Sequence, residues 1–455
     1  MSKKQSVDLK LNYPQIVLIG FGFLASSLAW AVYNSQVPLI LDERFHLSRT
    51  LIGTIMTIDN FFGVLLQPLI GAWSDNTRSR LGRRMPWIVI GLPICAILFS
   101  IIPLQQVLPN FMGVVIAFNF IMALWRSPVV SLMPDVTPSP LRSQANGIIN
   151  LMGGLGAILA FYVGGILSDI GDNKFYAFFM ASIIMAIALV VLLAFVRDPD
   201  ALNFREEHRL PIRSSIANRW GQAARDQFAR YNATKPSQAE LFQANDDKQR
   251  SLTIFLALPT AHKKSLVALL IAIFAWFLGN NAVETFFTLY ATSTYGLSGG
   301  QASMMLAGFS LAFLICAIPA GILAQKIGRK TSILIGIVGF ITIFLLIIAE
   351  PTQGLLQLLL MVGGGFWALM NINALPMVLE FASERSIGSF TGYYYLFSFT
   401  ASIVSPILYG FIQDLFNTGE LLFVFALVCF VIALISMVLV QHGDNEDDFL
   451  VVESD

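Results

Sequence analysis

The sequence predicts an all-α membrane protein whose twelve transmembrane helices form two pseudo-symmetric six-helix bundles. Three observations lead to this fold class. The chain is 56% hydrophobic and only 12% charged, long apolar runs recur along it, and two short polar motifs occur once in each half. A soluble protein carries about 25% charged residues. A run of about 20 apolar residues is long enough to cross a ~30 Å hydrocarbon core as a helix.

The predicted spans follow one another with a single long polar interruption. Spans one to six give an N-terminal bundle within residues 1–196, and spans seven to twelve give a C-terminal bundle within residues 263–441. Residues 197–262 form a polar linker, predicted cytoplasmic, in which Ala217–Phe228 is expected to be a surface helix, and residues 442–455 form an acidic tail. The spans are expected at residues 15–40, 51–73, 87–105, 111–136, 144–170, 174–196, 265–291, 301–324, 331–349, 353–379, 388–413 and 419–440.

The positions of Lys and Arg predict the orientation in the membrane. Lys3, Lys4 and Lys10 precede the first span, which places the N-terminus in the cytoplasm because positive charge is retained on that side. Threading twelve spans from there also places the C-terminus in the cytoplasm. The basic residues then fall on the cytoplasmic side, except Arg44, Arg49 and Lys174 outside and Arg126 within a span. We therefore expect a multi-pass protein of the cell membrane.

The reactive residues argue against several classes of function. Cys95, Cys316 and Cys429 all lie within predicted spans, so a disulfide framework is not expected. The four histidines lie outside the spans without a metal-like spacing, so neither an enzyme nor a metal site is expected. The linker carries no phosphate-binding loop or nucleic-acid motif. We expect no cofactor, no catalytic residue and no nucleic-acid partner.

A polar turn that occurs twice indicates an internal duplication. The segment Gln67–Ile88 is echoed by Gly321–Lys330 at the corresponding place in the second half. In both, a glycine closes an apolar run, a polar residue (Asp75, then Gln325) follows four positions on, and a Gly-Arg-Arg or Gly-Arg-Lys cluster starts the next run. Repeated halves of this kind are typical of membrane transporters.

A second pair of motifs supports the duplication. Asp135 ends the fourth span and is followed by Arg142, whereas Glu380 ends the tenth span and is followed by Arg385. Each acid–arginine pair flanks a short turn on the side predicted to be cytoplasmic. Two separate echoes at a near-constant offset are not expected by chance.

The long form of the first turn, QPLIGAWSDNTRSRLGRRMP at residues 67–86, carries a family resemblance. Two six-helix halves with such a turn resemble the major facilitator superfamily. The long form is similar to the glycoside–pentoside–hexuronide:cation symporters, closest to the branch of plant sucrose/proton symporters and their bacterial and animal relatives. Trp30-Ala31, Asp135 and Ala275-Trp276-Phe277 fit the same branch. The resemblance implies the major facilitator fold, with helices 1, 4, 7 and 10 around a central cavity.

The same resemblance favours a proton over a sodium ion as the coupling ion. The melibiose branch of this family carries two aspartates in the second span that contribute to its sodium site. Gly63 and Gln67 occupy the matching positions here. Since a hard cation wants several oxygen ligands, this replacement favours proton coupling.

The predicted substrate site combines aromatic rings with polar side chains. A sugar needs a flat apolar face to rest on and hydrogen-bond partners for its hydroxyls. Four tryptophans fall one apiece in helices 1, 4, 7 and 10, and Asn or Arg accompanies them at helical spacing. Two alternatives stay open: packed or lipid-facing bulk for each Trp, and interhelical hydrogen bonding for each Asn. The predicted substrate-binding residues are Trp30, Asn34, Asn119, Trp125, Arg126, Trp276, Asn280, Trp367 and Asn371.

Three acidic residues are candidates for proton coupling: Asp59, Asp135 and Glu284. Asp59 lies about 18 Å and Arg126 about 13 Å into the membrane at 1.5 Å per helical residue. A charge buried in hydrocarbon is costly and marks a functional hypothesis with a partner. We expect Asp59 and Arg126 to pair or to share substrate and proton, with a permanent structural salt bridge as the alternative.

Charged residues at the predicted cytoplasmic ends of the spans form a candidate gate. Asp75 with Arg83 and Arg84 is expected to latch the halves in one state, and Gln325 makes the second copy unequal. Asp135 has two readings, as a proton-coupling residue by resemblance and as a latch by its echo in Glu380. The predicted gate residues are Asp75, Arg83, Arg84, Arg142, Glu380 and Arg385.

The sequence thus predicts a secondary active transporter that imports an α-glucoside disaccharide, such as sucrose or maltose, by proton symport. The two bundles would rock around a midplane site in alternating access. The expected partners are the sugar and the lipid bilayer, with the protein as a monomer. The alternatives are a transporter of another small solute, an exporter of the same fold, and a sugar sensor that does not transport.

Overall fold

A computed structural model describes residues 9–171, 173–211, 215–233, 258–349, 352–382 and 386–441. All regular secondary structure in these ranges is helical. They contain twelve helical spans of 18 to 36 residues that are apolar enough to cross a membrane. The predicted all-α class and its twelve spans are therefore confirmed. The acidic tail and the middle of the linker lie outside the described residues.

The first six spans are built from eight helices. The second span is broken at Thr57 into α2 and α3, and the fifth contains a π-helical turn at Ala160–Gly164 between α6 and α7. The helices are α1 (Tyr13–Glu43), α2 (Arg49–Met56), α3 (Ile58–Asn76), α4 (Met85–Ile101), α5 (Leu108–Val136), α6 (Arg142–Leu159), α7 (Gly165–Ser168) and α8 (Phe175–Phe195).

The linker contributes two helices to the described structure. These are α9 (Pro199–Glu207) and α10 (Ile216–Ala233), and α10 contacts both α5 and α8. The surface helix predicted at residues 217–228 is confirmed and is slightly longer than expected. The last six spans are the continuous helices α13 (Thr260–Tyr295), α14 (Gly299–Ile327), α15 (Arg329–Ile348), α16 (Gln353–Leu379), α17 (Ile387–Phe416) and α18 (Leu421–Val438).

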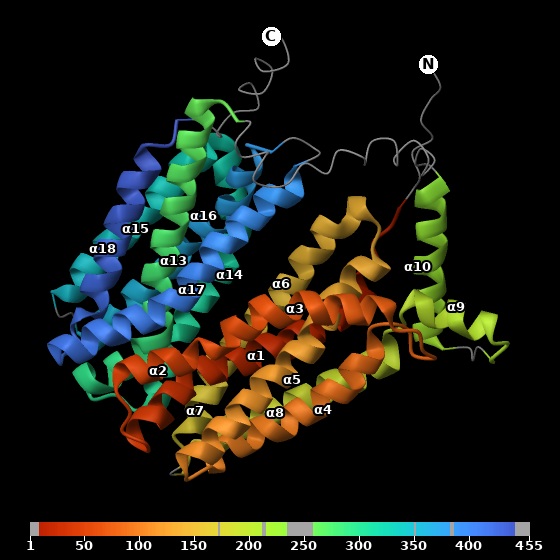
Figure 1. Cartoon of the computed structure of the whole chain (residues 1–455), viewed down its shortest axis with the longest axis horizontal. Helices are drawn as coiled ribbons and strands as arrows, with labels where there is room; N and C mark the ends of the chain where they lie inside the picture. The colour runs from red at the N-terminus through yellow and green to blue at the C-terminus, as the bar shows by residue number, and fades with distance from the viewer. Residues whose placement is uncertain are drawn as a thin grey trace. The chain divides into compact units, whose positions relative to one another are not determined.

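The two halves of the sequence repeat the same helix packing. In the first half, α4 packs against α5 and α8. In the second, α15 packs against α16 and α18, which occupy the same places in the repeat (Figure 1). Repeated packing of this kind is what the duplicated turns indicated.

The compact units differ from the predicted bundles at one place. One unit consists of residues 1–33 and 61–248, and the other of residues 34–60 and 249–455. The end of α1, all of α2 and the start of α3 therefore pack with the helices of the second half. By the predicted orientation, residues 34–60 contain the extracellular turn between the first two spans.

Two glycines explain how α2 lies so close to α17. A Cβ atom at Gly53 would overlap with the carbonyl oxygen of Pro406, and one at Gly410 would overlap with the carbonyl oxygen of Arg49. Small residues let helix backbones approach closely in membranes. Both positions therefore admit only glycine at this separation of the two helices.

We expect Gly410→Leu to destabilise the second unit by about 1–3 kcal/mol, because the added side chain forces the two backbones apart. The measurement is thermal unfolding of the purified protein in detergent. Gly392→Leu is the matched control, because it lies on the same helix and a Cβ there meets no atom within 4 Å. Equal melting temperatures for the two variants would contradict this account of the packing.

Candidate functional site

Two of the predicted sugar-binding residues of the first unit, Trp30 and Arg126, lie in contact, and Trp30 is half-buried. The guanidinium carbon of Arg126, on α5, lies 5.9 Å from the centre of the Trp30 ring on α1. A cation at this distance from an aromatic face is attracted to it. The Trp30 ring also meets Tyr33 edge-on, with ring centres 5.7 Å apart. The indole N–H of Trp30 is buried and has no hydrogen-bond partner in the described structure.

Asn119 contacts Tyr33, the residue that meets the Trp30 ring. Its amide nitrogen donates to the hydroxyl of Tyr33 across 3.3 Å, and the residue is 1% exposed. In this structure it therefore forms an interhelical hydrogen bond between α5 and α1, the alternative that its sequence left open. Sequence reasoning missed Tyr33, although its position three residues after Trp30 on the same helix face was a usable signal.

Two of the four tryptophans are packed in the protein core. Trp125 and Trp276 are both 0% exposed. Trp125 turns toward α4, where a Cβ at Gly91 would collide with it. The structure gives these two rings the packing role that was the alternative to sugar stacking, and it does not bring either ring to an open surface.

The second unit holds the other predicted polar residues. The amide nitrogen of Asn34, near the end of α1, donates to a carboxylate oxygen of Glu284 on α13 across 3.2 Å. Asn280 is half-buried one turn earlier on α13. Trp367 on α16 is 8% exposed and meets Phe277 edge-on with ring centres 5.6 Å apart, and Asn371 is half-buried one turn further along α16.

Asp59 lies in the first turn of α3, directly after the break in the second span. Backbone N–H groups at a helix start favour a negative charge there. Its pairing with Arg126 stays a prediction.

Three predicted gate residues of the first unit, Asp75, Arg83 and Arg84, form one ionic cluster with Asp135 at the turn between α3 and α4. Asp135, at the end of α5, accepts hydrogen bonds from Arg83 across 2.8 Å and from Arg84 across 2.7 Å. Arg84 also pairs with Asp75 and donates to the hydroxyl of Ser74 across 2.7 Å. Two guanidinium groups thus bind one carboxylate within the first unit, and the role of these residues as a latch between the halves stays a prediction. We call Asp75, Arg83, Arg84 and Asp135 the inner cluster.

Sequence reasoning missed two further acids that contact the inner cluster, Asp198 and Asp200. The carboxylate of Asp198, which is 0% exposed, accepts the backbone N–H of Arg83 across 2.9 Å and that of Arg84 across 3.3 Å. Gly82, with φ of +96°, forms the turn against it and leaves no room for a Cβ. Asp200 adds an ion pair to Arg83 at 3.0 Å. The usable signal was Asp-Pro-Asp after the sixth span, a helix N-cap pattern.

The other predicted gate residues divide into three cases. Arg142 donates to the backbone carbonyls of Thr137 and Pro134, at 3.1 and 3.2 Å, and does not bind Asp135. Glu380 pairs with Arg329 in the second unit. This ion pair corresponds to the pair of Asp135 and Arg83 in the first unit. Arg385 lies outside the described residues.

A polar contact at the predicted extracellular end was not foreseen. Asp414, near the end of α17, accepts the backbone N–H groups of Arg49 and Thr50 at 2.8 Å each and the Thr50 hydroxyl at 2.6 Å. Its carboxylate thereby binds the first N–H groups of α2, which have no partner within their own helix. No local pattern signals a contact between residues this far apart in sequence. We call Asp414 with the start of α2 the outer contact.

A second bond strengthens the attachment of residues 34–60. The Gln36 side chain on α1 donates to the hydroxyl of Ser303 on α14 across 2.7 Å, and both residues are buried. Together with the Asn34–Glu284 bond, it ties the outer part of α1 to two helices of the second half.

The buried Asp198 gives a pH prediction. Burial raises the pKa of its carboxyl, and the charges of Asp200 and Asp135 add to this, while the N–H donors of Asp200 and Arg83 act in the opposite direction. A raised pKa means that the folded protein binds the proton more tightly than the unfolded chain. Asp198 therefore favours folding below the ordinary aspartate pKa of about 3.9, and this contribution is lost as the pH rises through the folded pKa.

We expect Asp198→Asn to flatten the fall in melting temperature as the pH is raised from about 4 to 6, relative to the unaltered protein. The measurement is thermal unfolding in detergent across this range. Asp226→Asn is the matched control, because this aspartate is exposed on α10 and is not among the groups that act on Asp198. Parallel curves for the unaltered protein and Asp198→Asn would contradict the role of this carboxyl.

Comparison with known proteins agrees with the arrangement of the helices. The sequence profile of the Major Facilitator Superfamily matches residues 19–299 and 269–448. Among solved structures, a crystal structure of the nucleoside transporter NupG superposes with a TM-score of 0.67, covering 94% of this chain and 100% of that one at 16% identity. At that identity the likeness concerns the fold alone.

Curated relatives divide between symporters and drug-resistance proteins. An uncharacterized symporter of Synechocystis is 25% identical over 30% of this chain and 27% of its own length. The proton-associated sugar transporter A of mouse is 30% identical over 35% of this chain and 22% of its own length. These two matches thus span about a quarter of each relative.

A third relative is aligned over most of its length. The class D tetracycline resistance protein of Salmonella ordonez is 25% identical over 79% of both chains. The profile match over nearly the whole sequence and the shared fold lead to one conclusion: this chain belongs to the major facilitator superfamily and is a multi-pass membrane transporter, not an enzyme.

Proposed function

We propose that this transporter imports an α-glucoside disaccharide, such as sucrose or maltose, by proton symport and alternating access. The observation that carries the proposal is the half-buried pair of Trp30 and Arg126 on α1 and α5. A tryptophan face suits the apolar side of a sugar ring, and a guanidinium offers several donors to hydroxyl oxygens. The partial match to a proton-associated sugar transporter supports the same cargo class, and the partial match to a symporter supports coupled transport.

An exporter of amphipathic compounds is the second candidate. Its support is the tetracycline resistance protein, which aligns over more of the chain than the sugar transporter does. An arginine within a span is costly in hydrocarbon and normally faces water or a polar ligand. We favour the hydroxylated cargo because the half-buried Arg126 offers hydrogen bonds that an apolar cargo would leave unused.

We assign the proton to Glu284 among the three candidate acids. Both carboxylate oxygens of Asp135 accept hydrogen bonds from the guanidinium groups of Arg83 and Arg84 in the inner cluster, contacts that suit a structural role. The hydrogen-bond partner of Glu284 is a neutral amide, that of Asn34. A charge-assisted hydrogen bond is roughly twice as strong as a neutral one. Protonation of Glu284 therefore weakens one of the bonds that hold α1 against α13.

Alternating access then uses the outer contact as its extracellular gate. Residues 34–60 belong to the first half in sequence but pack with the second unit. In the transport cycle these residues would leave α13, α14 and α17 so that sugar could reach the site from outside. The inner cluster would act in the opposite phase, as the cytoplasmic gate predicted from the sequence.

The proposed function predicts uptake of labelled sucrose or maltose into energised vesicles that is abolished by a protonophore and unchanged without sodium. Arg126→Gln should weaken apparent sugar affinity about 10- to 100-fold, because a hydrogen bond to a charged group is lost. Arg230→Gln, on the exposed part of α10, is the control. Sodium-dependent uptake would refute proton coupling. Export of tetracycline without accumulation of either sugar would favour the second candidate.

If Glu284 carries the proton, its loss should affect accumulation of the sugar and exchange of the sugar differently. Glu284→Gln should abolish proton-driven accumulation of the sugar while retaining its exchange down a gradient, because a glutamine keeps the shape but cannot release a proton. Counterflow and accumulation are measured in the same proteoliposomes. Glu420→Gln, at the start of α18, is the control. If Glu284→Gln still accumulates sugar against a gradient, another acid carries the proton.

A further inference from the structure

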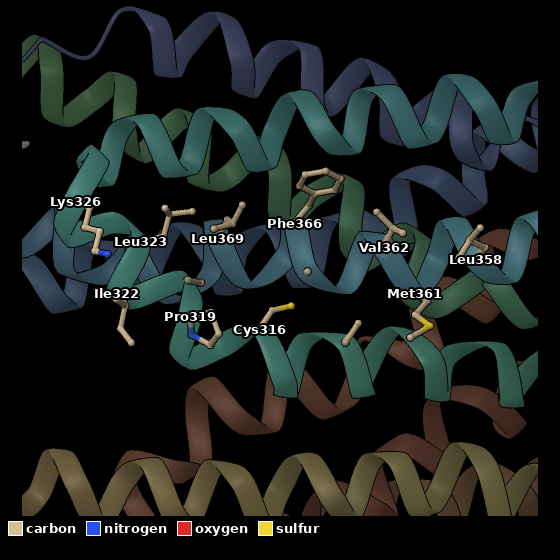
Figure 2. Close-up of a pocket in the computed structure, with 13 residues that line it drawn as sticks. Cys316, Pro319, Ile322, Leu323, Lys326, Leu358, Met361, Val362, Phe366 and Leu369 are labelled. Carbon is tan, nitrogen blue, oxygen red and sulfur yellow. The ribbon is translucent and has the colours of Figure 1, made fainter.

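The second unit contains a cavity that the proposed function does not use. It is a groove of about 780 Å³ between α14 and α16 in the second unit. None of the nine predicted substrate-binding residues lines it. Figure 2 shows side chains from both helices along it, with Lys326 at one end and Leu358 and Met361 at the other. Apart from Lys326, the groove is lined by apolar residues, glycine and Cys316.

Lys326 gives the groove a charged end. It lies in the last turn of α14, and among the described residues its ammonium group makes no hydrogen bond or ion pair. By the predicted orientation, this end of α14 lies at the cytoplasmic surface of the membrane. A basic residue between helices on that side is a typical contact for an acidic lipid headgroup.

The dimensions of the groove fit an acyl chain. From Ala312 to Lys326 it follows α14 for fourteen residues, or about 21 Å at 1.5 Å per residue. One leaflet of a ~30 Å hydrocarbon core is about 15 Å deep. A chain whose headgroup sits at Lys326 can therefore lie in the groove along the full depth of its leaflet.

The groove is also open to its surroundings. Several of its apolar residues are exposed, among them Ile322, Leu358 and Val362. Ile322 continues a row of exposed residues along α14 that includes Ile315 and Ile318. Apolar side chains exposed on a membrane-spanning helix face lipid chains or other apolar matter.

We propose that this groove is a binding site for an anionic phospholipid of the cytoplasmic leaflet, with its phosphate at Lys326 and one acyl chain between α14 and α16. The site is independent of the solute that the protein carries. It would hold α14 and α16, the helices on either side of the groove, at a fixed separation.

Cys316 offers a built-in reporter of occupancy. Its thiol lines the groove and is half-exposed, whereas Cys95 and Cys429 are buried. An apolar maleimide should therefore alkylate Cys316 at a rate that falls when a lipid chain covers it. Cys316→Ser identifies the labelled position.

The experiment compares alkylation of the full chain in nanodiscs of phosphatidylcholine alone and with added phosphatidylglycerol. We expect alkylation to be about fivefold slower with the anionic lipid, because one lysine near an anionic surface strengthens lipid binding by about this factor. Lys326→Gln should lose this protection, whereas Lys264→Gln, at the start of α13, should retain it. Equal rates in both membranes, or protection that survives in Lys326→Gln, would overturn the proposal.

A second variant tests the groove itself. A Cβ at Gly365 would lie 3.5 Å from the sulfur of Cys316, so a leucine there extends into the groove without displacing backbone. Gly365→Leu should lower the amount of phosphatidylglycerol retained after purification, measured by native mass spectrometry, at an unchanged melting temperature. Undiminished retention would overturn the proposal. So would protection of Cys316 by tetracycline in pure phosphatidylcholine, which would assign the groove to an amphipathic cargo.

Discussion

The hydrocarbon core of a membrane offers no hydrogen-bond partners, and the arrangement of this chain follows from that constraint. The backbone N–H and C=O groups of the spans therefore hydrogen-bond to one another within helices. Polar side chains within the spans must find one another or face water. Asn34 therefore binds Glu284, Asn119 binds Tyr33, and the Arg126 guanidinium lies over an indole ring. To residues of this group, Arg126 with Trp30 and Glu284, we assign the binding of the solute and of the proton.

The same constraint governs the helix ends, where the first N–H groups lack partners. Asp198 binds the N–H groups at the start of α4, and Asp414 binds those at the start of α2. Each aspartate comes from a distant part of the chain and attaches that part to a helix terminus. The carboxylate part of each contact consists of a few hydrogen bonds, so these bonds can be made and broken without unfolding either helix. This property suits a gate.

The sequence predicted the spans and the duplication well because both depend on local hydrophobicity and short motifs. It assigned both Arg126 and Trp30 to the substrate site, but it expected Arg126 to pair with Asp59 and did not foresee its contact with Trp30. It could not tell which face of a helix meets a cavity and which meets another helix, since both faces are apolar in a membrane. Trp125 and Trp276 were for this reason grouped with Trp30, although both are core residues. The partners of Asp414 lie more than 360 residues away, and no local pattern encodes that pairing.

The central claim is that residues 34–60 separate from α17 during transport. Spin labels at Leu51→Cys on α2 and Phe411→Cys on α17, both exposed positions, would report this distance in proteoliposomes once the native cysteines are replaced. The account predicts two distance populations, with the longer one favoured by acidic pH and shifted by maltose. A single short distance that neither pH nor sugar alters would show that this contact is a permanent part of the fold and would contradict the account.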